Sequence, residues 1–359
     1  MSSEADSVEA RLAGLALACP VPFTDADRVL LGHGSGGKMS ADLIARCFLP
    51  AFANPYLDKQ DDQAVLRVDG ARVAFTTDSY VVTPLFFPGG DIGALAVNGT
   101  VNDLAMAGAR PLYLSAAFIL EEGFPLADLQ RIADSMRSAA RAAGVLLVTG
   151  DTKVVDRGKA DGCFVTTSGL GLVEHGSEIS CDRARPGDAV ILSGPIAEHG
   201  LAIMATRAEL DLETPITSDT APLHLLVRAM LDTGAAIRCL RDPTRGGVAT
   251  TLNEIARRSG VGVVLEETAI PVREPVRGLA ELLGLDPLYV ANEGVLIAVV
   301  APEDAARVTT SMRARPEGRD AQIIGRVVED PSRLVVLETR VGGRRIVDML
   351  SGEQLPRIC

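Results

Sequence analysis

The chain has 359 residues, a formal net charge of −12 and no tryptophan. This length exceeds what one ordinary hydrophobic core supports, so two domains are expected. Hydrophobic residues make up 47% of the chain, enough to fill two cores with few aromatic side chains. The acidic balance argues against nucleic acid as a main partner, because phosphate backbones are bound by clustered lysine and arginine.

Neither a membrane span nor a secretion signal is predicted. No apolar run reaches the roughly 18 residues that a membrane-crossing helix needs. The short apolar run 12–19 follows acidic residues, the wrong charge for a signal peptide, and residues 1–28 are interpreted as a loosely ordered leader. None of the six cysteines forms a C-x-x-C pair, so neither a zinc ribbon nor a thioredoxin motif is present. We therefore expect a protein of the reducing cytoplasm.

Residues 29–40 form a glycine-rich segment that includes Gly36, Gly37 and Lys38. Glycines let backbone N–H groups approach phosphate oxygens closely, and a lysine adds a positive charge. The spacing is not that of a Walker A loop. Two interpretations stay open, a phosphate-binding loop or a flexible loop before a helix predicted over residues 40–49.

A strand ending at residue 68 and another over 72–77 are predicted on either side of the turn Asp69-Gly70. Antiparallel pairing brings Asp62, before the first strand, close to Asp78, after the second. Two carboxylates at one edge repel each other unless a cation lies between them. The pair suggests a metal site, with two solvated loop aspartates as the alternative.

A helix is predicted from the N-cap Asp91 to about residue 107. It carries Asn102 and Asp103, and buried amide and carboxyl groups need partners. Either these side chains cap neighbouring loops, or Asp103 joins the two hairpin aspartates around Mg²⁺.

The rest of the first half continues with a predicted strand over 112–120, a helix over 126–143 and a short buried strand over 145–148. The short strand runs into Asp151 and Lys153, and the end of a strand is a usual place for a ligand site. With a closing strand over 163–173, four aspartates lie at element ends, which predicts a metal–triphosphate site.

The second half, from a boundary near residues 180–187, alternates helices with strands and predicts an α+β layer domain. Its loop 240–247, which contains Asp242, is charged and precedes a helix, as in an anion site. Glu293 lies in apolar surroundings, where burial raises the pKa of a carboxyl group and favours a general base, with an ion-paired structural glutamate as the alternative. Helices are expected over 198–209, 221–236, 247–259, 272–283 and 302–314, and strands over 189–193, 262–266, 294–300, 321–328 and 333–338.

The chain ends on Cys359, after a segment that is loosened by Gly342, Gly343 and Gly352. Residues 342–359 are predicted to be a flexible tail whose thiol enters a pocket and leaves it again. An incidental exposed thiol is the alternative.

These motifs together resemble the HypE family of hydrogenase maturation proteins, within the superfamily of aminoimidazole ribonucleotide synthetase and selenophosphate synthetase. The resemblance covers residues 29–359 and rests on His33–Lys38, Thr76–Ser79, Phe86–Asp91, Thr100–Ala105, Thr149–Lys153, Asp242–Gly247, Ala291–Gly294 and Pro356–Cys359.

The resemblance implies a two-domain, PurM-like α+β fold. Residues 29–178 would bind ATP and dimerise through a barrel of paired sheets, and residues 179–341 would form the second domain. It also implies Mg²⁺ on Asp62, Asp78, Asp103, Asp151 and, less directly, Asp242. The nucleotide would contact these four N-terminal aspartates together with Gly36, Gly37, Lys38 and Asn102.

The family reaction begins when HypF places a carboxamide on the terminal cysteine, here Cys359. The HypE protein then dehydrates it with ATP to a thiocyanate, and the cyano group passes to iron on the HypC–HypD complex, for [NiFe]-hydrogenase. The resemblance implies that Glu293 is the base and that Lys153 orients the carboxamide. A selenophosphate synthetase is the first alternative, but residues 33–38 contain no cysteine. A non-catalytic adaptor is the second.

Overall fold

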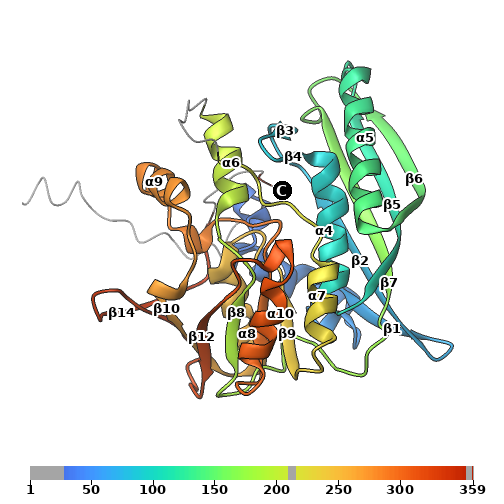
Figure 1. Ribbon diagram of the computed structural model, residues 1–359. Coiled ribbons are helices and arrows are strands. Elements are labelled where there is room, and N and C mark those ends of the chain that lie inside the picture. The colour runs from blue at the N-terminus through green and yellow to red at the C-terminus, as the bar shows by residue number, and fades with distance from the viewer. Residues whose placement is uncertain (1–27, 209–215, 353–357, 359) are drawn as a thin grey trace, which may run out of the picture.

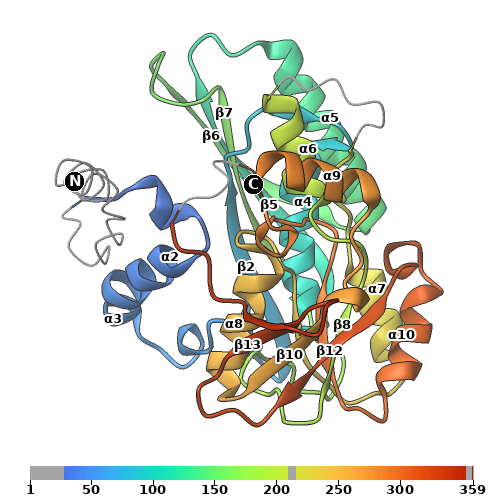
Figure 2. The same cartoon turned by 90° about the vertical axis from the view of Figure 1, so that its left-hand side faces the viewer.

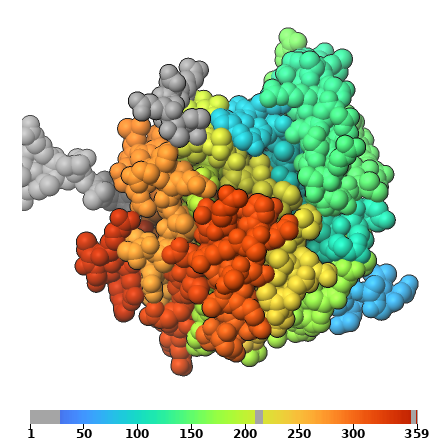
Figure 3. All heavy atoms as spheres, viewed as in Figure 1, coloured from blue at the N-terminus to red at the C-terminus, as the bar shows by residue number. Residues whose placement is uncertain are grey.

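Two β-sheets organise the computed structural model, which describes residues 28–208, 216–352 and 358 (Figure 1). The first sheet has the strand order β1-β2-β7-β5-β6, and the second has seven strands. The two units form one continuous body, from which the tip of the β1–β2 hairpin projects (Figure 3). Within the described ranges, no helix is both long and apolar enough to cross a membrane.

The first sheet has one face covered by helices and one face open. Neighbouring strands are antiparallel, except that β5 and β6 run parallel. Helices α4 and α5 cover one face, and α4 also contacts α7 of the second unit. The bounds are β1 Ala64–Val68, β2 Ala71–Tyr80, α4 Ile92–Met106, β5 Arg110–Glu121, α5 Leu126–Ala143, β6 Leu146–Val155 and β7 Cys163–Leu172.

Helix α4 lies between the two units, which explains why it is apolar on nearly all sides. The predicted N-cap is confirmed, because Asp91 Oδ1 accepts hydrogen bonds from the backbone N–H groups of Gly93 at 2.7 Å and Ala94 at 3.0 Å. Almost every side chain of the helix is buried, including Asn102. Its polar side chains therefore face protein groups.

The second sheet is buried on both faces, with the order β14-β13-β10-β12-β8-β11-β9. Alternate residues of β8 enter different cores: Val190 and Leu192 pack with α8, whereas Ile191 packs with α7 and α10. The bounds are β8 Ala189–Leu192, α6 Glu198–Arg207, α7 His224–Leu231, β9 Ile237–Arg241, α8 Gly247–Ser259, β10 Gly262–Glu266, α9 Glu274–Leu283, β11 Ile297–Val300, α10 Ala305–Arg313, β12 Gln322–Val328, β13 Val335–Glu338 and β14 Arg344–Ile346.

Several predicted elements differ from the structure. The helix predicted over 221–236 is shorter, because β9 takes the residues from Ile237 onward and the helix ends at Leu231. Arg238 and Arg241, which lie within β9, interrupt the apolar pattern that would have predicted a strand. The helix predicted over 40–49 is a continuous helical segment made of α2 Lys38–Leu43, a π-helix Ile44–Phe48 and α3 Leu49–Phe52. The predicted leader lies almost entirely outside the described residues.

Residues 342–352, the first part of the predicted flexible tail, are held by the body of the protein. Strand β14 pairs with β13, and Val347 and Met349 are buried. The stretch then passes α2 (Figure 2), where Lys38 N–H donates to the Leu350 carbonyl at 2.9 Å. Any free tail therefore begins later than residue 342. Of the final residues the structure describes Ile358, which is buried.

Candidate functional site

Five carboxyl groups from five different elements meet where the two units join: Asp62, Asp78, Asp103, Asp242 and Glu293. Asp62 precedes β1, Asp103 lies in α4, and Asp242 follows β9. Glu293 is 3% exposed and Asp242 is 6% exposed. Residues that are 231 positions apart in the chain are thus brought into one electrostatic environment. The structure also places Asp78 within β2, which continues to Tyr80, and not after the strand as predicted.

Burial, and after it mutual repulsion, raises the pKa values of this cluster. Burial raises the pKa of Asp103 well above its ordinary value, and the charges of Asp242, Asp62 and Asp78 raise it further. Burial is also the main cause of the raised pKa of Glu293, with Asp242 adding to it. Burial raises the pKa of Asp242 to about 6. The cluster therefore favours any partner that brings positive charge.

Arg241 compensates part of this charge on one side of the cluster. Its Nε lies 2.7 Å from Asp62 Oδ1, and its Nη2 lies 2.9 Å from Glu254 Oε2. Its third nitrogen, Nη1, donates to Cys181 Sγ at 3.1 Å. Because Arg241 is engaged on three sides, it holds Asp62 in place but does not neutralise the remaining carboxyls.

Within this cluster of five, two buried carboxylate oxygens have no hydrogen-bond partner, Asp62 Oδ2 and Glu293 Oε1. Such atoms are rare unless a ligand satisfies them. In the part of the chain that the structure describes, no three His, Cys, Asp or Glu side chains form a ready metal-binding group. Mg²⁺ commonly binds one or two carboxylates together with phosphate oxygens and water. The donors therefore fit an ion that arrives with a nucleotide better than an all-protein metal cage.

The glycine-rich segment packs against the predicted anion loop. Gly36 has φ +77°, and a Cβ there would lie 2.7 Å from Arg245 Cβ, so a larger residue would displace the loop. Arg245 Nη1 also donates to the Gly34 carbonyl at 3.1 Å. Gly37 is likewise confined by the Leu350 backbone. The two segments that were predicted separately thus form one structure beside the carboxyl cluster.

Three of the predicted side chains point elsewhere in this chain. Lys38 Nζ pairs with Asp348 at 2.5 Å, which ties α2 to the segment after β14. Asp151 and Lys153 pair with each other at 2.6 Å on the exposed edge strand β6, with side chains 62% and 70% exposed. The predicted strand end is wrong, because β6 continues to Val155 and Gly150 remains paired with Ala116 of β5.

Asn102 serves to position Glu293. Its Nδ2 donates to the carbonyls of Ala221 at 3.1 Å and Glu293 at 3.2 Å, and its Oδ1 accepts from Leu223 N–H at 2.8 Å. These contacts use both ends of the amide. A nucleotide contact donated by Asn102 Nδ2 would have to replace one of them, whereas Oδ1 keeps one free lone pair for the predicted contact.

Asp219 is a site residue that the sequence did not reveal. Its Oδ1 accepts from the N–H of Glu293 at 3.1 Å, while its Oδ2 is buried without a partner. Burial raises the pKa of Asp219 to about 7. It lies in a polar run, Thr217–Thr220, that resembles an ordinary loop, so only its contact with Glu293 distinguishes it.

Family models match both units of the chain. The AIR synthase related protein N-terminal domain matches residues 60–173, and the C-terminal domain of the same protein matches residues 185–337. Carbamoyl dehydratase HypE of Azotobacter vinelandii is 61% identical over 91% of this chain and 96% of that protein. The chain belongs to the HypE family. The predicted family and the predicted α+β, PurM-like fold are both confirmed.

Solved HypE structures agree with this assignment. HypE in a HypE-HypF complex is 49% identical, with a TM-score of 0.82 over 86% of this chain and 99% of that one. HypE in complex with ATP is 50% identical, with a TM-score of 0.78 over 92% of this chain and the whole of the other. The carboxyl cluster thus lies on a HypE framework.

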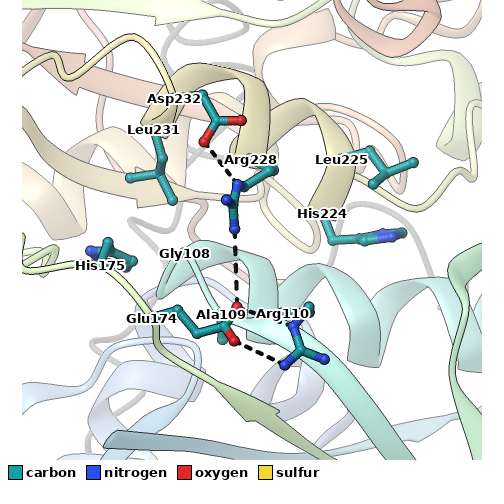
Figure 4. A pocket seen from close by; sticks show the side chains of 10 residues that line it. All are labelled: Gly108, Ala109, Arg110, Glu174, His175, His224, Leu225, Arg228, Leu231 and Asp232. Atoms are coloured by element: carbon teal, nitrogen blue, oxygen red, sulfur yellow. Dashed lines mark hydrogen bonds and ion pairs between the residues drawn. The ribbon is translucent and has the colours of Figure 1, made fainter.

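A separate pocket of about 410 Å³ lies between the two units and contains none of the predicted site residues (Figure 4). Arg228 of α7 pairs with Asp232 at 2.8 Å and approaches Glu174 at 4.0 Å. Glu174 also pairs with Arg110 of β5 at 2.9 Å. Of these pairs, only the approach of Arg228 to Glu174 crosses the junction, and both side chains are about half exposed, so this pair adds little to the packing between the units.

Without a divalent cation, the protein is expected to lose stability as the pH rises from about 4 to 7. An aspartate in an unfolded chain ionises near pH 4, whereas the folded pKa is about 7 for Asp219 and about 6 for Asp242. Their stabilisation is complete below the unfolded pKa and is lost as the pH rises through the folded values. We expect the Tm to fall by at least about 3 °C, measured by calorimetry, and magnesium to restore it at pH 8. An unchanged Tm would show that these carboxyls ionise normally.

Proposed function

We propose that this HypE-family protein uses ATP to dehydrate a carboxamide carried on its own Cys359. The product would be a thiocyanate, the source of the cyanide ligand for the iron of [NiFe]-hydrogenase. One observation carries the proposal: Ile358, the neighbour of Cys359, is 4% exposed in the core that includes Ala291, two residues from Glu293. This shared core supports the proposal that Cys359 reacts near Glu293, the buried carboxyl proposed to accept a proton.

The chemistry requires an activated oxygen and a base. The carboxamide oxygen attacks the γ-phosphorus of ATP and ADP leaves, which turns a poor leaving group into a phosphate ester. Loss of one N–H proton and cleavage of the C–O bond release phosphate, and loss of the second N–H proton leaves the nitrile. Glu293 would accept the proton from nitrogen. Its backbone is fixed through Asn102 and Asp219, so the carboxyl is pre-positioned.

The nucleotide would bind at the carboxyl cluster with Mg²⁺. Asp62, Asp78, Asp103 and Asp242 are the proposed donors, because together they hold buried negative charge and Asp62 has an unpartnered oxygen. The metal would neutralise phosphate charge and lower the pKa of the nearby Glu293, which favours its basic form. The relative crystallised with ATP supports a nucleotide here.

A homodimer is proposed from the open face of the first sheet. Phe75, Leu170, Tyr113 and Leu146 are neighbours across four strands on this face, and each is at least 36% exposed. A continuous apolar stripe of this kind is typical of an interface. Pairing there would also bring Asp151 and Lys153 on β6 into the interface, where we propose that they contribute to the site. In one chain alone they do not reach it.

The partners follow from the proposed reaction. HypF, which forms a complex with the crystallised HypE relative, would supply the carboxamide. A HypC–HypD iron scaffold would receive the cyano group. We place the reaction in the cytoplasm, where a thiol stays reduced.

The proposal is tested by the intact mass of the wild-type protein. Incubation with HypF, carbamoyl phosphate and ATP should add one carboxamide, located by peptide mapping to the last residues. Further Mg-ATP should then remove the mass of one water, and EDTA should prevent the loss. If ATP is hydrolysed while the mass at Cys359 never changes, the protein phosphorylates a different substrate and the proposal fails.

Asp103→Asn is expected to raise the stability of the metal-free protein and to lower its rate of ATP hydrolysis. The variant should be more stable than wild type without metal, because it removes a buried carboxyl whose pKa burial and three aspartates raise. The bond from Thr76 Oγ1, at 2.6 Å, can be kept by the amide oxygen. Mg-ATP hydrolysis should fall about 10²-fold or more. Calorimetry with and without Mg-ATP measures both effects, and unchanged hydrolysis would remove Asp103 from the nucleotide site.

A further inference from the structure

His199 connects the first turn of α6 to the end of the chain. Its side chain is fully buried, and its ring meets Phe87 edge-on with centroids 5.5 Å apart. Nε2 lies 2.5 Å from the Ile358 carbonyl oxygen, and Nδ1 lies 2.8 Å from Ser218 Oγ. Both ring nitrogens are therefore occupied, one of them by the residue next to Cys359.

The surrounding hydrogen bonds define the tautomer of this histidine. The Ile358 carbonyl can only accept, so Nε2 must carry the proton. In a neutral ring with its proton on Nε2, Nδ1 is an acceptor, so Ser218 Oγ donates to it while accepting from Thr220 N–H at 3.2 Å. Burial lowers the pKa of His199 to about 4, in agreement with a neutral ring. His199 therefore has one N–H donor, at Nε2, and it points to the carbonyl oxygen of Ile358.

The docked position has two parts, a donor and an apolar seat. The donor is His199 Nε2–H, and the seat is the core that contains Ile203, Ala291 and the side chain of Ile358. Holding the Ile358 carbonyl fixes one side of the peptide bond to Cys359. The seat is shared with Ala291, which lies two residues before Glu293 in the chain.

We propose that His199, with its tautomer set by Ser218, is a positioning residue that holds the chain end in place for dehydration. This inference rests on the proposed function, since it assigns the docked state to that reaction. At Ile358, the described residue of this segment, the docked state has one hydrogen bond and one buried side chain, contacts that would have to be released when the cysteine is loaded by another protein. In this proposal the hydrogen bond from His199 forms while the carboxamide is dehydrated and is broken while Cys359 is loaded.

The test compares three substitutions in the full-length protein. His199→Phe keeps an aromatic ring beside Phe87 but removes both hydrogen bonds. His199→Gln keeps an N–H donor at a similar distance from the backbone, and Ser218→Ala removes the group that sets the tautomer. Two rates are measured for each: single-turnover dehydration of HypF-loaded protein, and alkylation of Cys359 by iodoacetamide. Alkylation is assigned by peptide mapping, because Cys47 is also exposed.

His199→Phe should dehydrate the carboxamide about 10- to 100-fold more slowly. It should also alkylate Cys359 several-fold faster and accept the carboxamide from HypF at least as fast as wild type. His199→Gln should restore most of the dehydration rate, and Ser218→Ala should lie between the two. Ile358→Ala changes only the seat and should also accelerate alkylation, which keeps the test valid if His199→Phe does not fold.

The proposal is overturned if Phe and Gln variants lose dehydration equally and neither alters alkylation, since His199 would then act on the fold alone. Equal alkylation in wild type and Ile358→Ala would overturn the docked seat. Failure of the proposed function looks different: wild-type protein would never lose water from a loaded Cys359. The alkylation rates would still report whether His199 holds the chain end.

Discussion

Cys359→Ala is expected to abolish both mass changes, the gain of the carboxamide and the later loss of water. The thiol is the proposed point of attachment, and no other residue in the C-terminal segment 352–359 is a thiol. The proposed nucleotide site should remain intact, because the buried Ile358 and the carboxyl cluster are unchanged. Binding of Mg-ATP, measured by calorimetry, should therefore stay within about twofold of wild type. Cys47→Ala, which removes an exposed thiol elsewhere, is the matched control.

Mixing two inactive variants tests whether Cys359 is processed by the carboxyl cluster of its own chain or by that of another chain. Ile358 is buried within its own chain, so loaded Glu293→Gln protein mixed with Cys359→Ala protein should show no dehydration. Recovery of activity in the mixture would mean that the cysteine of one chain is processed by the other. A carboxamide found on Cys359→Ala protein itself would contradict the assignment of Cys359.

Glu293→Gln should accept the carboxamide normally but dehydrate it about 10²- to 10⁴-fold more slowly. The amide has nearly the same shape, and the backbone contacts from Asn102 and Asp219 do not involve the changed group. What is lost is the ability to accept a proton. Single-turnover mass spectrometry of loaded protein gives the rate directly, with the exposed Glu122→Gln as a charge-matched control.

The pH dependence adds a second check on Glu293. Burial and nearby aspartates raise the pKa of Glu293, so the basic form grows as the pH rises. Wild-type dehydration should therefore increase with pH through a pKa above that of an ordinary glutamate, and Glu293→Gln should lose this dependence. If the variant keeps more than about a tenth of the activity and the same pH profile, the base is a different group. Asp219, with a pKa of about 7, is then the first to replace.

Local signals in the sequence predicted much of the framework. Helices α5 and α8 begin and end where the apolar periodicity and the glycines after them indicate, at Gly144 and Gly260. The β1–β2 hairpin follows from Asp69-Gly70 between two alternating runs. These elements depend on neighbours within a few residues, so they can be predicted from the sequence without the tertiary structure. The aspartate motifs were assigned to one site by the family resemblance and not by local signals, and in one chain Asp151 lies outside that site.

Tertiary structure decided which polar groups face one another. Asp62, Asp103 and Glu293 are joined by packing between two units, and their raised pKa values come from burial that no local pattern encodes. Packing also kept Asp151 and Lys153 apart from them, because β6 is an exposed edge strand that continues past its predicted end.

The contact between His199 and Ile358 spans 159 positions and joins the start of α6 to the Pro356–Cys359 motif, a pairing that no local pattern predicts. A sequence gives the donors and acceptors, but folding decides which of them remain unsatisfied and which are paired. For this chain the sequence determined the family, the elements and the acidic groups. Only the tertiary structure, through burial and a long-range contact with His199, determined where Ile358 is held.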